Sequence, residues 1–151
     1  LYGTLEVPGA ADNPTIIAWA KETGLSNVYK HDATAWCGLY LAVVAKRAGK
    51  PVVQGPLWAL NWSKFGVLKT PPGLGDVLCF KRPGGGHVGI YIAEDPTASH
   101  VLGGHQGDKV SIIRVEKARC VAHRRPIYTN QPASVKPYHV AATGALSTNE
   151  A

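Results

Sequence analysis

The sequence predicts an α+β domain in which N-terminal helices pack on an antiparallel β-sheet. Apolar helical segments occupy the first half of the chain, and short β-rich segments separated by Gly and Pro occupy the second half. Because strands and helices do not alternate, a parallel βαβ sheet is not expected. The 17 Gly and 11 Pro residues also argue against a coiled coil or a simple helical bundle.

Two helices are expected before residue 50. The first begins at Pro14, with Asn13 as its capping acceptor, and ends at Gly24. The second covers residues 34–48 and is apolar almost throughout until its basic last turn. This pattern is typical of a buried central helix.

A third, shorter helix is expected over residues 57–65. It carries Trp58 and Trp62 at an i, i+4 spacing, which places two side chains on one side of an α-helix. Packing of both indoles in the core is the simplest interpretation of this spacing.

The β-rich segments begin after residue 73 and predict an antiparallel sheet. Strands are expected over residues 76–80, 87–92, 99–102, 110–115 and 119–124. Residues 1–128 are therefore assigned to one domain. From residue 129 the chain is rich in Pro, Ala, Ser and Thr, so residues 129–151 are expected to form a loosely packed tail.

Length, composition and charge exclude several classes of protein. A chain of 151 residues with 45% hydrophobic and 17% charged residues suits one domain with a buried core. The formal charge of +6 is compatible with polyanionic partners. The basic residues are scattered and form no helix-turn-helix, zinc finger or basic stripe, so nucleic acid is not expected as a partner. No apolar run approaches the roughly eighteen residues of a membrane span.

The three cysteines are Cys37, Cys79 and Cys120. Their odd number and the lack of CxxC spacing exclude a dense disulfide framework and a cysteine-rich zinc site. Cys79 and Cys120 fall in expected strands, where core thiols are the simplest interpretation. A disulfide between them is the alternative if the two strands are neighbours.

Cys37 and His87 are the candidate catalytic pair. Cys37 lies in or beside the first turn of the expected central helix, where unpaired N–H groups and the helix dipole favour a thiolate. His87 follows the run Pro83-Gly84-Gly85-Gly86 and begins an expected strand. A cysteine peptidase or amidase needs an imidazole within hydrogen-bond reach of its thiolate, and a third polar group that fixes the imidazole tautomer.

Two histidines compete for the third role. His100 lies in an expected strand, and His105 lies in the following segment Gly103-Gly104-His105-Gln106-Gly107. Strand alternation places His100 and Leu102 on one face, but the two glycines can break that alternation. Gln106 would alternatively orient the imidazole or donate to an oxyanion.

Four motifs in this order carry a resemblance to a known family. They are Asp32-Ala33-Thr34-Ala35-Trp36-Cys37, Gly75-Asp76-Val77-Leu78-Cys79-Phe80, Gly86-His87-Val88-Gly89-Ile90-Tyr91 and Leu102-Gly103-Gly104-His105-Gln106. Over roughly residues 5–127 the chain resembles papain-like cell-wall hydrolases of the NlpC and CHAP types. It is most similar to small single-domain members found among phage endolysins and secreted bacterial effectors.

The resemblance implies a papain-like fold and a cysteine peptidase or amidase that cleaves an amide bond of peptidoglycan through an acyl-enzyme. It implies Cys37 as nucleophile, His87 as general base and His105, favoured over His100, as the third residue. Family members tend to have Gly-Gly-Asn-Gln where this chain has Gly-Gly-His-Gln, so His105 replaces an amide. Trp36 and Gln106 are assigned to substrate binding, with core packing as the alternative for Trp36.

The expected partner is bacterial peptidoglycan, the expected state is a monomer, and no metal or cofactor is required. The chain is expected to act in the bacterial cell wall or periplasm. Because Leu1-Tyr2-Gly3-Thr4 has no signal-peptide character, release by lysis or export by a dedicated secretion system is expected. The residues leave open whether the chain is an amidase or an endopeptidase.

Two other functions are compatible with the sequence. One is a non-catalytic wall-binding module that uses the positive charge, Trp58 and Trp62 to contact glycan. The other is a zinc hydrolase, because imidazole and thiolate are zinc ligands. Its ligands would be His87, His100, His105 and Cys79.

Overall fold

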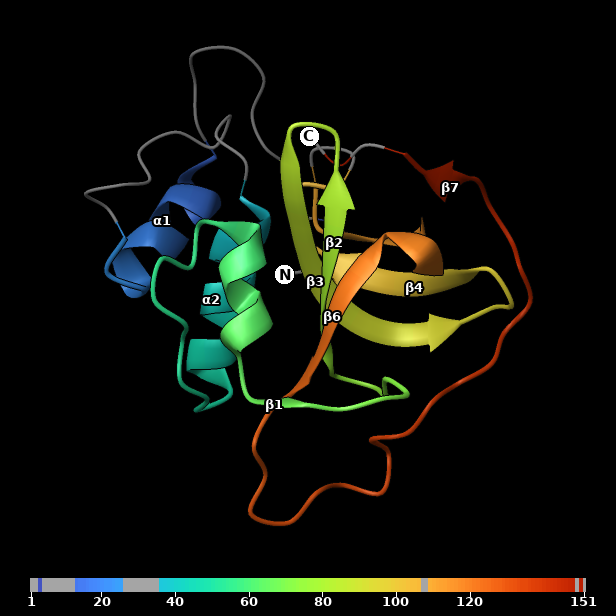
Figure 1. Ribbon diagram of the computed structural model, residues 1–151. Coiled ribbons are helices and arrows are strands. Elements are labelled where there is room, and N and C mark those ends of the chain that lie inside the picture. The colour runs from blue at the N-terminus through green and yellow to red at the C-terminus, as the bar shows by residue number, and fades with distance from the viewer. Residues whose placement is uncertain (1–2, 4–12, 26–35, 107–108, 149, 151) are drawn as a thin grey trace.

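The computed structural model describes residues 3, 13–25, 36–106, 109–148 and 150 (Figure 1). Within these residues, α1 (Pro14–Glu22) and α2 (Cys37–Arg47) lie beside a curved, mostly antiparallel sheet. The α+β class expected from the sequence is therefore confirmed. No helix among the described residues is long and apolar enough to cross a membrane.

Both early helices begin where local chemistry favours a helix start. The Asn13 side chain accepts a hydrogen bond from the Thr15 N–H at 2.8 Å, and Pro14 occupies the first turn of α1, as predicted. The central helix α2 begins at Cys37 and is buried over most of its length. The expected helical residues 34 and 35, with the rest of segment 32–35, lie outside the described residues.

The third helix is a 3₁₀-helix, η1 (Ala59–Lys64), and the expectation that Trp58 and Trp62 share one side is wrong. Trp62 is fully buried, whereas Trp58 is 68% exposed. Trp58 is the residue before the helix, and a 3₁₀-helix has three residues per turn, so positions four apart diverge by about 120°. An α-helix would have kept them within about 40°.

The five strands expected from the sequence are confirmed, with small changes at their ends. The described strands are β1 (Val67–Leu68), β2 (Val77–Arg82), β3 (Gly85–Glu94), β4 (Ala98–Gly103), β5 (Ser111–Glu116), β6 (Cys120–Arg125) and β7 (Leu146–Ser147). A second 3₁₀-helix, η2 (Lys117–Arg119), joins β5 to β6. Within the described residues the sheet order is β1-β6-β2-β3-β4-β5-β7, and only the β5–β7 pair is parallel. Two-residue strands such as β1 and β7 are too short to produce a periodic sequence pattern.

The sheet buries side chains on both faces. Val77, Cys79 and Val88 pack with α2 in the larger apolar cluster. A second cluster contains the alternate residues of the same strands, among them Leu78 and Phe80. Since successive strand side chains point to opposite faces, β2 and β3 each contribute to both clusters.

The cysteines are free thiols, and no Cys79–Cys120 disulfide forms. Their strands, β2 and β6, are neighbours as the disulfide alternative required, but the register pairs Cys79 with Ala122 and Phe80 with Cys120. Cys79 packs in the cluster with α2, whereas Cys120 packs against the second cluster. The two sulfur atoms therefore lie on opposite faces of the sheet.

The segment after residue 128 is mostly exposed and is held at a few points. β7 pairs with β5, and the Tyr138 N–H donates to the Tyr91 hydroxyl at 3.1 Å. The Glu150 carboxylate is buried and accepts two hydrogen bonds from the Arg119 guanidinium, at 2.6 and 3.0 Å. These contacts attach the end of the described chain to the sheet edge.

A buried ion pair joins the turn before β2 to β6. The Asp76 carboxylate is fully buried, and Arg125 donates to it from Nε and Nη2, each at 2.9 Å. The Gly73 N–H donates to the same carboxylate at 2.9 Å. Truncating one partner of such a pair leaves the other charge buried without compensation.

We expect Asp76→Ala to lower the free energy of unfolding by about 3 kcal/mol or more, because the Arg125 guanidinium would lose its counter-ion. Urea unfolding followed by tryptophan fluorescence measures this change. The matched control is Glu22→Ala, which removes an ion pair to Arg47 whose two side chains are 34% and 48% exposed, and which should change stability little. Equal losses of unfolding free energy in Asp76→Ala and Glu22→Ala would contradict the stabilising role of the buried Asp76–Arg125 pair.

Candidate functional site

Cys37 is the first residue of α2, and a close approach of the chain shapes its surroundings. The next residue, Gly38, has no side chain, and a Cβ there would lie 2.0 Å from the Pro56 carbonyl oxygen. Only glycine allows the 55–58 segment to lie against this helix start. The sequence Cys37-Gly38 thus places a thiol beside a loop that packs directly on the helix.

A cavity of about 650 Å³ opens at this point. Its walls come from the segment after α1, the start of α2, the segment leading into η1 and the β2–β3 turn. The lining residues are Leu25, Cys37, Gly55, Pro56, Leu57, Trp58, Ala59, Arg82, Gly84, Gly85 and Gly86. Cys37 is 6% exposed, so its thiol forms part of the inner wall of the cavity.

The electrostatic environment of the Cys37 thiol is mixed. Burial raises its pKa, while hydrogen bonds from the backbone N–H groups of Val88 and Gly38 and the positive charge of Arg82 act in the opposite direction. Burial has the larger effect, so the pKa of Cys37 lies above its ordinary value. A group that removes the thiol proton is therefore needed for nucleophilic chemistry.

The His87 imidazole is held by Gln106. His87 is fully buried in β3, and its Nε2 lies 2.7 Å from the Gln106 Oε1. The Gln106 amide nitrogen donates to the carbonyls of Val101 and Ser111, at 3.1 and 2.7 Å, so the amide oxygen faces the imidazole. This geometry assigns the neutral tautomer with the proton on Nε2 and the acceptor lone pair on Nδ1.

The Nδ1 atom of His87 is buried and accepts no hydrogen bond from the described residues. Burial lowers the pKa of His87 to about 4, and the Gln106 hydrogen bond and the negative charge of Glu150 oppose this shift. The imidazole is therefore neutral at pH 7. Its Nδ1 lone pair is the proton acceptor that this residue offers.

The structure brings His87 to Gln106 and places its imidazole on the opposite face of β3 from Cys37. Val88 packs in the same apolar cluster as Cys37, and the preceding side chain must point to the other face. There His87 pairs across the ladder with Phe80, with ring centroids 6.4 Å apart. The sulfur and the imidazole lie on either side of one strand.

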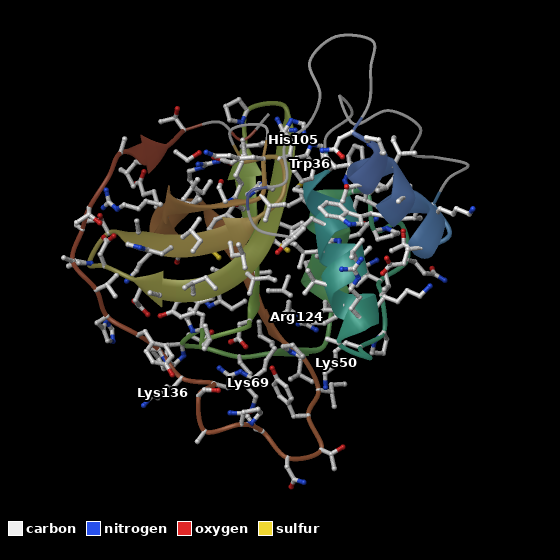
Figure 2. The ribbon with its side chains drawn as sticks, turned by 180° about the vertical axis from the view of Figure 1, so that it is seen from behind. Trp36, Lys50, Lys69, His105, Arg124 and Lys136 are labelled. Carbon is white, nitrogen blue, oxygen red and sulfur yellow. The ribbon has the colours of Figure 1, made fainter. Side chains whose placement is uncertain are left out.

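His105 lies at the start of α2 instead of beside His87. Its Nδ1 accepts a hydrogen bond from the Trp36 N–H at 3.0 Å, and the centroids of the His105 and Trp36 rings lie 5.8 Å apart. Figure 2 shows this pair together at one end of the molecule. His105 has a φ of 56°, a left-handed conformation that His, Asn and Asp adopt more readily than most residues. Of the third-residue candidates, Gln106 is the one that contacts the His87 imidazole.

His100 is engaged elsewhere, in the β4–β5 region. Its Nε2 lies 2.7 Å from the Asp95 carboxylate, which also accepts a hydrogen bond from the Arg114 Nε at 2.9 Å. These contacts, with that of Arg114 first, hold the pKa of Asp95 well below its usual range. His100 belongs to this polar cluster and not to the Cys37 cavity.

The structure disfavours two sequence assignments, the substrate contact of Trp36 and the zinc site. Trp36 is fully buried, and the centroid of its ring lies 6.1 Å from that of Trp19. This burial favours core packing of Trp36 over contact with substrate. The zinc site is not assembled, since no group of three or more His, Cys, Asp or Glu side chains in the described part of the chain is placed to hold a metal ion. Cys79, one of its suggested ligands, is directed at the Ala59 carbonyl, 3.8 Å away.

Sequence reasoning missed Arg82 and Glu150. Arg82 lines the cavity, and the negative charge of Glu150 acts on His87 from the end of the chain. The arginine next to the glycine run was a usable signal. Nothing in the pattern of the tail indicated that Glu150 would fold back near β3.

Comparison with protein-family models, curated proteins and solved structures finds no match.

We expect the protein to lose stability as the pH falls from about 6.5 towards 4. In this range the unfolded chain binds a proton at residue 87 and the folded chain does not, because the pKa of His87 is lowered from 6.5 to about 4. The full effect corresponds to about 3 kcal/mol. Urea unfolding at a series of pH values should show a shallower pH dependence for His87→Gln over this interval. The same slope in both proteins would show that His87 does not stay neutral in the folded state.

Proposed function

We propose that this chain is a cysteine hydrolase that cleaves an amide bond of peptidoglycan in the bacterial cell wall or periplasm. The observation that carries the proposal is the position of Cys37, at the first turn of α2 and in the wall of a cavity of about 650 Å³. Backbone N–H groups of Gly38 and Val88 point at its sulfur. The order of the four sequence motifs supports the same function.

The proposed reaction has three parts: deprotonation of the Cys37 thiol, attack of its sulfur on the amide, and hydrolysis of the resulting thioester. The Cys37 thiol gives its proton to Nδ1 of His87, and the sulfur forms a bond to the amide carbonyl carbon. Backbone N–H groups at the start of α2 stabilise the oxyanion, an effect worth about 3 kcal/mol per donor. The C–N bond then breaks, and the proton on Nδ1 passes to the leaving amine. Water then gives a proton to Nδ1 of His87 and attacks the carbonyl carbon of the thioester. The C–S bond breaks, the proton on Nδ1 returns to the Cys37 sulfur, and the acid is released.

This assignment requires His87 to reach the α2 side of β3 in the active site. The run Gly84-Gly85-Gly86 precedes His87 directly and has the backbone freedom to change the direction of the following side chain. This movement would break the hydrogen bond between His87 Nε2 and Gln106, whose amide nitrogen is fixed to the Val101 and Ser111 carbonyls. His105, which already lies on the α2 side beside Trp36, is the competing base.

Cys37→Ala should reduce the release of soluble muropeptides from purified sacculi by roughly a thousandfold or more, because no other group replaces the nucleophile. Mass spectrometry of the released fragments measures the loss and identifies the bond that is cut. The control is Cys120→Ala, which removes a free thiol outside the cavity and should retain activity. Unchanged turnover by Cys37→Ala would remove Cys37 from the mechanism.

The histidine variants test the base. His87→Ala should lose roughly a hundredfold or more in kcat/KM, whereas His100→Ala should remain close to the parent because His100 is bonded to Asp95. Gln106→Ala should fall between them, since it frees the imidazole that Gln106 holds. If His105→Ala abolishes turnover and His87→Ala does not, His105 is the base and the assignment of His87 is wrong.

A non-catalytic wall-binding module is the second candidate, and two observations favour it. The His87 imidazole and the Cys37 sulfur lie on opposite faces of β3, and Trp58 is exposed at the cavity rim, where an indole can stack on a sugar ring. In that case the parent protein would sediment with sacculi and release no fragments. Trp58→Ala would weaken this binding, and Cys37→Ala would not.

A further inference from the structure

The end of the molecule away from Trp36 and His105 carries a group of basic side chains. Figure 2 shows Lys50, Lys69, Arg124 and Lys136 together at that end. Lys64 belongs with them, because it lines a cavity of about 180 Å³ with Lys50 and Ile127. We call these five residues the basic end.

The charge of the basic end is largely uncompensated. Lys64 and Lys69 are exposed residues and form no salt bridge with any described residue. The buried carboxylate in this region, Asp76, is neutralised by Arg125. Arg124 donates to the Phe65 and Gly66 carbonyls, which hold its cation in place without neutralising it.

Exposed aliphatic side chains lie among these cations. Leu68 is 66% exposed and immediately precedes Lys69. Ile127 is 65% exposed, and its carbonyl accepts a hydrogen bond from the Lys50 ammonium at 2.6 Å. β1 and β6 connect the two sites, since Leu68 pairs with Arg124, three residues before Ile127. Large aliphatic groups between lysines fit a partner with a charged surface and an apolar layer below it.

We propose that the basic end docks on a membrane surface rich in anionic phospholipid. The lysines contact headgroup phosphates, and Leu68 and Ile127 enter the boundary between headgroups and acyl chains. A soluble polyanion would satisfy the lysines but would leave the aliphatic side chains in water. This proposal does not depend on the proposed catalytic activity.

Docking in this way leaves the cavity accessible. Cys37 begins α2, whereas Lys50 follows its last turn, so the thiol and the basic end lie at opposite ends of this helix. An enzyme bound through the basic end would present its cavity away from the membrane, and the wall polymer in front of the membrane would be within its reach.

The experiment is co-sedimentation of the full chain with vesicles of phosphatidylglycerol and phosphatidylcholine in equal parts, and with phosphatidylcholine alone. We expect binding to the anionic vesicles only, and weaker binding as the salt concentration rises. The double variant Lys64→Gln/Lys69→Gln should bind about thirtyfold more weakly. The matched control Lys81→Gln/Lys109→Gln carries the same change in charge at exposed positions outside the basic end and should bind like the parent.

A second pair of variants separates membrane from soluble polyanion. Leu68→Ser/Ile127→Ser should bind anionic vesicles severalfold more weakly and should bind soluble polyphosphate as the parent does. Equal loss of vesicle binding in the two lysine pairs would mean that net charge alone is responsible, and would overturn the proposal. Vesicle binding that is unaffected by the serine variants would overturn it in favour of a soluble polyanion. None of these measurements uses enzymatic turnover. A negative result would therefore overturn membrane docking without bearing on the proposed hydrolase activity.

Discussion

Strand β3 is buried on both faces, and this burial restricts the register of the sheet and the geometry of the candidate site. Its side chains alternate between the apolar cluster under α2 and the cluster around Phe80 and Tyr91. A strand in this position cannot shift by one residue without exchanging both clusters, so the direction of each side chain is strongly determined. The same alternation separates the His87 imidazole from the Cys37 sulfur.

The polar groups near β3 are organised to hold one tautomer of His87. Gln106 donates both of its amide hydrogens to backbone carbonyls and turns its oxygen to the imidazole. This leaves Nδ1 as a buried acceptor without a partner among the described residues, which costs free energy in the folded state. In the proposed mechanism this nitrogen takes the Cys37 thiol proton only after His87 has turned to the α2 side of β3.

The two ends of α2 have different chemistry. Its N-terminus carries Cys37, the cavity and backbone N–H groups that favour negative charge. Its C-terminus carries Lys46 and Arg47 and leads to Lys50 and the basic end, where cations suit the dipole. One helix therefore separates a site suited to an oxyanion from a surface suited to phosphate.

Local patterns were enough to predict the α+β class, the start of α1 at Asn13-Pro14 and the five main strands, because caps and side-chain alternation depend on neighbouring residues only. The sequence also identified Cys37 at a helix start, but it favoured His105 as the orienting residue and gave Gln106 only as an alternative. The fold shows three features that these local patterns did not predict: Trp58 and Trp62 diverge, Cys79 and Cys120 face apart, and Gln106, not His105 or His100, holds His87. These outcomes depend on strand register, helix type and contacts between distant segments, and a local pattern carries no information about such contacts.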